Sequence, residues 1–216
     1  MKIKKLDLLI SIYIAAICMA ELMGGKVFQL TDKIQFFGNP LGTSVAVLFI
    51  PLIFSINDII VETYGKQRMQ SIMRSGLVVI FLLFIFSMIA TMLPTAERSF
   101  ISAETYNQVF QVAQRVAVAS LTAFAVSMVL DVIVFSKVRD RLKKYGLWFR
   151  NITSNIIAQF VDTTIFMYIA YLNFSNPNHD FLWSIIIPYW VYKCIVSVLI
   201  IPVVYLGVSW LKNEIN

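Results

Sequence analysis

The segment NITSNIIAQFVDTTIFMYIAYLNF, Asn151–Phe174, decides the fold because it places a carboxylate near the middle of a long apolar run. Counted as a helix, Asn155, Gln159 and Asp162 recur at three- and four-residue steps, and Ser154 belongs to the same polar stripe. A carboxylate at this depth is costly in lipid unless its side of the helix meets other helices or a wet cavity. The stripe therefore predicts a functional site inside a membrane protein.

The composition of the whole chain agrees with a membrane protein. Of its 216 residues, 59% are hydrophobic and 14% are charged, whereas soluble domains carry about 25% charged residues. The single histidine and the two cysteines, Cys18 and Cys194, form neither a metal-binding cluster nor a disulfide framework. Gly24-Gly25-Lys26 lacks the rest of a phosphate-binding loop, so these glycines are expected to permit close packing or local unwinding. We expect no enzyme, no cofactor and no metal.

Six segments come near or exceed the roughly 20 apolar residues that a spanning helix needs. They are Leu6–Phe28, Pro40–Val61, Ser75–Leu93, Val109–Phe135, Asn151–Phe174 and Phe181–Leu211. Pro202 is predicted to kink the last of them. The sequence therefore predicts an all-α membrane protein in which residues 1–216 form one six-helix domain. A division into two inverted halves of three helices stays open.

The basic residues predict the orientation in the membrane. They gather in the N-terminal segment, in the second–third and fourth–fifth connections and at the C-terminus, at Lys2, Lys4, Lys5, Lys66, Arg68, Arg74, Lys137, Arg139, Arg141, Lys143, Lys144, Arg150 and Lys212. The other side has Lys33, Arg98 and, at a helix end, Lys26. By the positive-inside rule both termini are cytoplasmic. The net charge of +6 is thus a topology signal, and a nucleic-acid partner is not expected.

This orientation can be tested with topology reporters. We expect reporters fused after Lys144 and at Asn216 to report the cytoplasm, and one fused near Asn176 to report the outside, because lysine and arginine bias sets orientation. Reporter activity in intact cells is the measurement. An outside signal after Lys144 would contradict the six-span arrangement.

Charges of both signs fall inside the predicted spans. They are Glu21, Asp58, Asp131 and Asp162 against Lys26, Arg115 and Lys193. A lone charge at the centre of a spanning helix costs about 3 kcal/mol on an insertion scale, so pairing is expected. Asp162 and Lys193 have similar depths on consecutive antiparallel helices, which predicts that they lie close together. One alternative is therefore a structural membrane protein whose charges are only ion pairs.

Four stretches resemble the queuosine precursor transporter family of bacterial inner membranes, also called the vitamin uptake transporter family. They are FIPLIFSINDIIVETYGK (Phe49–Lys66), RVAVASLTAFAVSMVLDVIVF (Arg115–Phe135), SNIIAQFVDTTIFMYIA (Ser154–Ala170) and VYKCIVSVLIIP (Val191–Pro202). The specific marks are Pro51 with Asp58 and Glu62, Arg115 with Asp131, Gln159 with Asp162 and Thr163, and Lys193 before Pro202. The resemblance runs from the first predicted helix to the last.

The resemblance implies import of 7-deazaguanine precursors of queuosine, namely preQ0, preQ1 or queuine, across a bacterial inner membrane. The family is also distantly similar to the six-helix substrate-binding subunits of energy-coupling vitamin importers, which implies a ligand site between helices. A binding subunit that needs a separate energising complex is thus a second alternative. The expected partners are a small deazaguanine and membrane lipid, and a homo-oligomer stays open.

The polar stripe offers the chemistry that a deazaguanine needs. Its ring N–H and adjacent amine can donate to one carboxylate, and an amide can serve its carbonyl. Aromatic rings stack on such bases, and Phe166, Phe160 and Tyr189 are candidates. An aminomethyl precursor is cationic and calls for a further acid such as Glu21. The candidate substrate-binding residues are Asp162, Gln159, Asn155, Ser154, Lys193, Arg115, Glu21 and Asp58.

Overall fold

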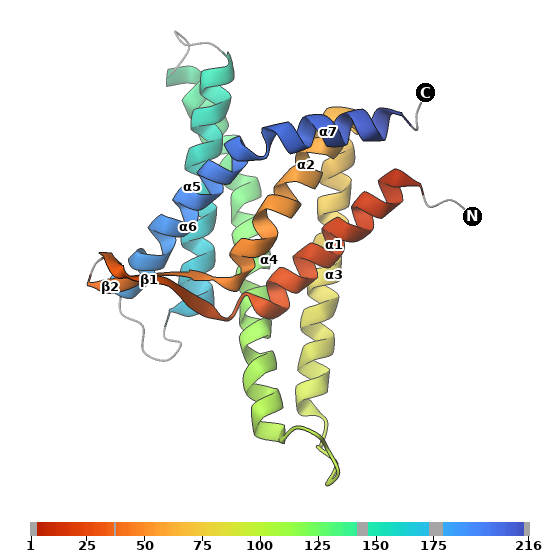
Figure 1. Ribbon diagram of the computed structural model, residues 1–216, viewed down its shortest axis with the longest axis vertical. Coiled ribbons are helices and arrows are strands. Elements are labelled where there is room, and N and C mark those ends of the chain that lie inside the picture. Colours follow the sequence, from red (N-terminus) through yellow and green to blue (C-terminus); the bar gives the residue numbers. More distant parts are fainter. Residues whose placement is uncertain (1–3, 37, 142–146, 173–178, 214–216) are drawn as a thin grey trace. The chain divides into compact units, whose positions relative to one another are not determined.

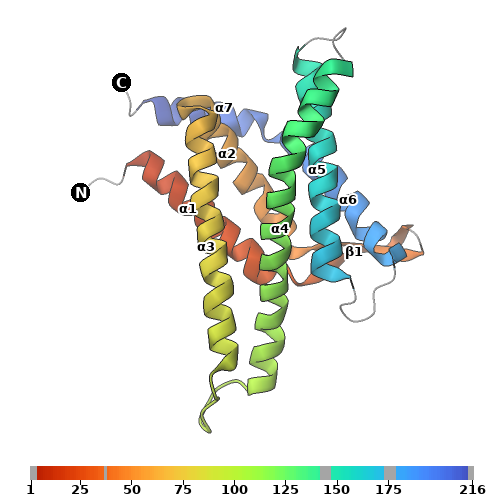
Figure 2. The ribbon, with the colours of Figure 1, turned by 180° about the vertical axis from the view of Figure 1, so that it is seen from behind.

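The structure, a computed structural model, is mostly helical and describes residues 4–36, 38–141, 147–172 and 179–213, without the side chains of 32, 36, 127–141 and 147–155. In chain order its elements are α1 (Lys5–Met23), β1 (Val27–Phe36), β2 (Asn39–Ser44), η1 (Val45–Phe49), α2 (Ile50–Tyr64), α3 (Lys66–Met92), α4 (Ala103–Arg141), α5 (Leu147–Tyr171), α6 (His179–Leu199) and α7 (Ile201–Lys212) (Figures 1 and 2). The predicted all-α membrane class is confirmed at this level.

Five stretches of the described chain are long and apolar enough to cross a membrane. They are Lys5–Met23, Val45–Tyr64, Lys66–Met92, Ala103–Val126 and His179–Leu199. The predicted fifth span, Asn151–Phe174, falls largely on α5, in which Ile156–Tyr171 is a shorter apolar helix. The full 25 residues of α5 extend about 37 Å, which exceeds a hydrocarbon core of about 30 Å. Six spans therefore stay a prediction that the helix lengths allow.

A β-hairpin follows α1 where the sequence analysis extended the first helix to Phe28. The helix ends at Met23, and β1 pairs with β2 in a two-stranded sheet. The sequence VFQLTDKIQF alternates between apolar and polar residues over most of its length, which favours a strand over a helix. Gly38 turns the hairpin with a φ of 75°, which a residue with a side chain rarely adopts. The second predicted span was expected to begin at Pro40. This start was also wrong, because Pro40 belongs to β2.

The last predicted helix, Phe181–Leu211, is two helices. Ile200 separates α6 from α7, and Pro202 lies in the first turn of α7. A proline is tolerated there because the first backbone N–H groups of a helix have no intrahelical partner. The kink predicted at Pro202 is thus a complete break, whereas Pro188 stays inside α6.

Close packing divides the chain into two units, and each is described by itself. The first comprises Met1–Phe28, Ser44–Ala117 and Tyr192–Asn216, and the second comprises Gln29–Thr43 and Val118–Val191. The single six-helix domain and the inverted halves both stay predictions.

The first unit has a core formed by α1, α2 and α3. Its buried side chains are Tyr13, Ile56, Ile60, Met69 and Ile72. A single residue, Gly65, connects α2 to α3, with φ 84° and ψ 163°. This backbone conformation is essentially restricted to glycine, so the antiparallel α2–α3 pair depends on that residue.

We expect Gly65→Ala to lower the stability of the folded protein by about 1–3 kcal/mol, because a side chain strains this conformation. An added Cβ would meet nothing within 4 Å, so the effect is backbone strain alone. The measurement is the thermal unfolding midpoint in detergent. Gly38→Ala is a matched control for a positive φ at an exposed hairpin turn, and we expect it to shift the midpoint less. An unchanged midpoint for Gly65→Ala would contradict this interpretation.

Candidate functional site

The polar stripe of α5 lies in the second unit and is partly buried. Gln159, Asp162 and Phe166 are each half-buried, and Thr163 beside Asp162 is fully buried. Ser154 and Asn155 belong to the first half of α5, but their side chains lie outside the described residues. The part of the stripe that the structure describes is therefore Gln159, Asp162 and Phe166.

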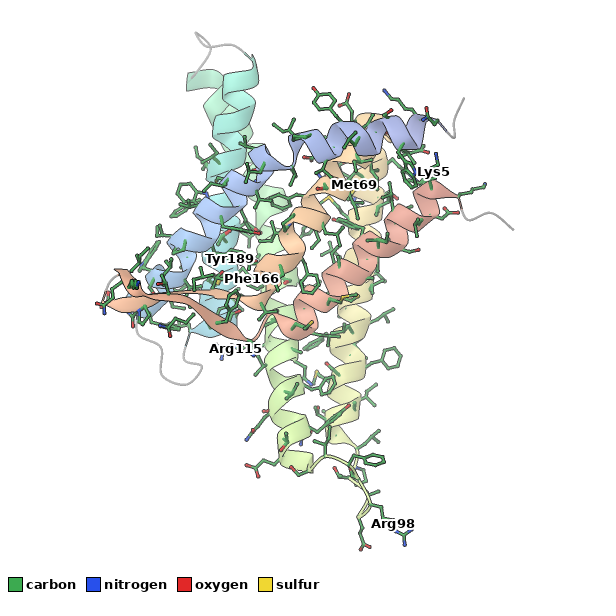
Figure 3. All side chains as sticks on the ribbon, in the orientation of Figure 1. Lys5, Met69, Arg98, Arg115, Phe166 and Tyr189 are labelled. Atoms are coloured by element: carbon green, nitrogen blue, oxygen red, sulfur yellow. The ribbon has the colours of Figure 1, made fainter. Side chains whose placement is uncertain are left out.

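Another side of α5 packs against α6 through aromatic rings. The Trp190 indole Nε1 donates a hydrogen bond to the Ile156 carbonyl oxygen at 3.2 Å. The Phe160 ring lies edge-on to Trp190, with centroids 5.2 Å apart, and stacks with Trp183 at 6.3 Å. Phe160 is thus engaged in helix packing, which weakens its interpretation as a base-stacking residue. Phe166, whose ring lies edge-on to Tyr171 with centroids 6.4 Å apart, and the buried Tyr189 stay predicted stacking residues; both are labelled in Figure 3.

The stripe and the packing side point in different directions from α5. Each residue turns an α-helix by about 100°, so Asp162 lies about 160° around the axis from Phe160. Gln159 and Phe166 lie on the same side as Asp162 by this count. Along the axis, Asp162 falls between Phe160, which contacts Trp190, and Tyr168, whose ring lies 6.4 Å from that of Trp183. The carboxylate therefore lies on the side of α5 opposite the contact between Phe160 and Trp190.

In the first unit, the C-terminal end of α1 is held to the start of η1 by polar contacts. The Ser44 hydroxyl donates to the Gly24 carbonyl oxygen at 2.6 Å and accepts from the Ala46 N–H at 3.2 Å. The Val45 N–H donates to the Lys26 carbonyl oxygen at 2.9 Å. Ser44 thus serves as the N-cap of η1 while closing the chain back onto α1. We call this set of contacts the Ser44 clasp.

Close packing at the two glycines, as predicted, occurs beside the Ser44 clasp. A Cβ added at Gly25 would overlap Val112 Cγ1 of α4. In Figure 1, α1 runs downward and α4 runs upward along the chain. One turn back along α1 lies Glu21, and one turn forward along α4 lies Arg115.

Glu21 and Arg115 therefore come to a similar level on two helices of the first unit. Glu21 is only 6% exposed, and Arg115, labelled in Figure 3, is half-buried. Opposite charges at one depth reduce the cost of holding either charge inside apolar helices. Both residues were separate candidates from the sequence. Their similar level follows only from the close approach of Gly25 to Val112.

Of the remaining charged residues, Asp58 and Lys193 belong to the first unit and Asp131 to the second. Asp58 of α2 is half-buried and accepts a hydrogen bond from Asn57 Nδ2 at 3.0 Å. Lys193 of α6 is half-buried, and the side chain of Asp131 lies outside the described residues. Because Asp162 and Lys193 fall in different units, their proximity stays a prediction.

Two hydroxyl residues at the end of the hairpin were not among the sequence candidates. Ser44 is 1% exposed, and a serine directly before the apolar run VAVLF is a typical N-cap signal that could have identified it. Thr43 is also buried, and its Oγ1 has no hydrogen-bond partner in the part of the chain that the structure describes. A buried hydroxyl in this state is a natural partner for a ligand or a water.

Ionisable side chains inside long apolar helices are rare in membrane proteins and often mark a substrate or ion pathway. A family profile described as "Putative vitamin uptake transporter" matches residues 44–207. The chain therefore belongs to the vitamin uptake transporter family, which comprises transporters and not enzymes.

Two bacterial relatives are similar over most of the chain. One, from Bacillus subtilis (strain 168), is named "Probable queuosine precursor transporter" and is 30% identical over 192 residues, which are 86% of this chain and 80% of the relative. A second with the same name, from Haemophilus influenzae, is 29% identical over 161 residues, which are 73% of this chain and 66% of the relative. No solved structure matches.

Proposed function

We propose that the chain imports 7-deazaguanine precursors of queuosine, namely preQ0, preQ1 or queuine, through the inner membrane of a bacterium, with both termini in the cytoplasm. The family membership and the names of the two relatives support a queuosine precursor as substrate. The observation that supports the binding mode is the half-buried stripe of Asp162 and Gln159 on the side of α5 opposite the Phe160–Trp190 contact.

In this proposal the base edge lies against the stripe. The Asp162 carboxylate accepts hydrogen bonds from the ring N–H and the exocyclic amine of the base, and the Gln159 amide donates to its carbonyl. Phe166, one turn further along the same side, stacks on the ring plane. Asn155, Ser154 and Lys193 complete the proposed site.

Glu21 is proposed to serve precursors that carry a cationic aminomethyl group. A carboxylate that is 6% exposed attracts an ammonium more strongly than an exposed one does, because water screens it less. Arg115, at a similar level on α4, compensates its charge when no cation is bound.

We expect Glu21→Gln to weaken transport of the aminomethyl precursor by about tenfold while changing transport of the neutral nitrile precursor less than twofold. A tenfold change corresponds to about 1.4 kcal/mol, a modest value for one lost charge contact. The measurement is competition of each unlabelled precursor against labelled uptake. Equal weakening for both precursors would show that Glu21 has a general structural role and no part in charge selection.

The proposed function is tested in a bacterium that cannot synthesise queuosine and lacks its own transporter. Expression of this chain should restore queuosine in tRNA when a precursor is supplied at low concentration, and failure with every precursor would overturn the proposal. Uptake by the purified chain alone in proteoliposomes would then separate a self-sufficient carrier from a binding subunit that needs an energising complex.

A further inference from the structure

The short last helix, α7, is too short to cross a membrane. Its 12 residues extend about 18 Å, against a hydrocarbon core of about 30 Å. The preceding helix, α6, has 21 residues and about 31 Å, so it reaches the membrane surface by itself. Figures 1 and 2 show α7 running across the direction of α3 and not along it. A helix that follows a complete span and runs across its neighbours is placed to lie along the membrane surface.

One side of α7 packs tightly on α2 and α1. Leu211 is fully buried and Val208 nearly so, and both belong to a cluster with Ile59 of α2 and Leu9 of α1. A Cβ added at Gly207 would overlap Ile59 Cδ1, so the two helices approach closely at this glycine. The position of α7 relative to α1 and α2 is thus well defined within the first unit.

The other side of α7 is largely apolar, and no other part of the described chain covers it. Tyr205 and Leu206 are 75% and 74% exposed, and Ile201, Val203 and Trp210 are exposed as well. Exposing this face to water would cost a free energy of about 25 cal/mol for every Å² of apolar surface. Trp and Tyr are enriched where apolar chains meet lipid headgroups, and Trp210 and Tyr205 fit that location.

Basic residues lie at the same end of the first unit. Lys5 Nζ donates to the Trp210 carbonyl oxygen at 2.6 Å and lies 4.9 Å from the centre of the Trp210 ring. Four further basic residues are exposed, namely Lys4 before α1, Lys66 and Arg68 at the start of α3 and Lys212 at the end of α7. The exposed acids nearby are Asp7 of α1 and Glu62 of α2. The end of the first unit at which α7 packs on α1 and α2 therefore carries a net positive charge.

We propose that α7 is an interfacial helix that binds the anionic lipid surface of the cytoplasmic leaflet. Its apolar face, formed by Ile201, Val203, Tyr205, Leu206 and Trp210, enters the boundary between headgroups and acyl chains. The basic residues Lys4, Lys66, Arg68 and Lys212 face anionic headgroups, each adding to the attraction. The inference does not depend on the substrate.

The test is the depth of a spin label at residue 206. The full chain carries Leu206→Cys in a background with Cys18→Ala and Cys194→Ala, and is reconstituted into vesicles that contain phosphatidylglycerol. Reference labels replace Val78, exposed within the apolar part of α3, and Glu97, exposed in the α3–α4 connection. Collision rates with oxygen, which prefers lipid, and with a nickel chelate, which prefers water, report depth.

We expect the label at 206 to lie between the two references, and to shift measurably toward water in vesicles of phosphatidylcholine alone. A water-like label at 206 in phosphatidylglycerol would overturn the interfacial position, and so would a label as deep as that at 78. Shielding from both reagents together with spin–spin broadening would show that a second copy covers the face instead. No shift between the two lipid mixtures would overturn the role of anionic headgroups.

Discussion

Asp162→Asn should reduce precursor uptake by roughly a hundredfold or more while leaving most of the protein in the membrane. An asparagine has nearly the same shape, but it replaces one acceptor oxygen with a donor, so the ring N–H or the amine of the base loses its partner. Burying a donor without an acceptor costs about 1–3 kcal/mol, and more when a charged group is lost. Initial uptake rate, normalised to the amount of protein in the membrane, is the measurement.

A matched control is Asp180→Asn, the same chemical change at an exposed position in the first turn of α6. We expect it to leave uptake within twofold of the unchanged protein. If Asp162→Asn lowers protein abundance as much as uptake, the carboxylate is a structural pair. If the Asp162→Asn variant transports normally, the Asp162 carboxylate does not bind the base edge of the substrate.

The second large effect concerns the substrate itself. A site built to hydrogen-bond an exocyclic amine should reject the 2-deamino analogue by a factor of about 10⁴, because its buried acceptor is then left unpaired. Excess precursor should therefore abolish uptake of the labelled compound, whereas the analogue at the same concentration should leave it unchanged. Competition in cells that make no queuosine provides the measurement.

Equal competition by the precursor and its 2-deamino analogue would rule out recognition through the Asp162 carboxylate. It would leave the transporter class untouched, because that rests on the family and on the apolar helices. A phosphate compound is not expected to compete, because phosphate recognition calls for clustered arginine and lysine. The described part of the stripe offers a carboxylate and an amide instead.

The presence of the long helices could be predicted from the sequence, because the length of an apolar run is enough to identify a span. The helices Lys66–Met92 and Lys5–Met23 are examples. The β-hairpin could also have been recognised, since Phe28, Leu30 and Ile34 alternate with polar residues; the count of apolar residues concealed that period. The break before Pro202 was predicted only as a kink. Proline restricts the backbone only locally, whereas the packing of α7 on Ile59 determines the direction of α7.

The candidate site was predictable only along a single helix. The spacing of Gln159, Asp162 and Phe166 identifies one side of α5 without any structure. The engagement of Phe160 with Trp183 and Trp190 depends on how α6 is aligned with α5, and no periodicity contains that alignment. The shared level of Glu21 and Arg115 likewise follows from a contact between Gly25 and Val112, which lie far apart in the sequence.

The Ser44 clasp ties together the two ends of the chain segment that forms the β-hairpin. Because the chain leaves α1 at Lys26 and returns beside it at Val45, the two ends of the excursion are already joined by hydrogen bonds. The cost of closing a longer loop rises only slowly with its length, so a few residues added at the turn of the hairpin change this cost little. An affinity tag inserted at Gly38, in the exposed turn, is therefore expected to leave the contacts between α1 and η1 in place.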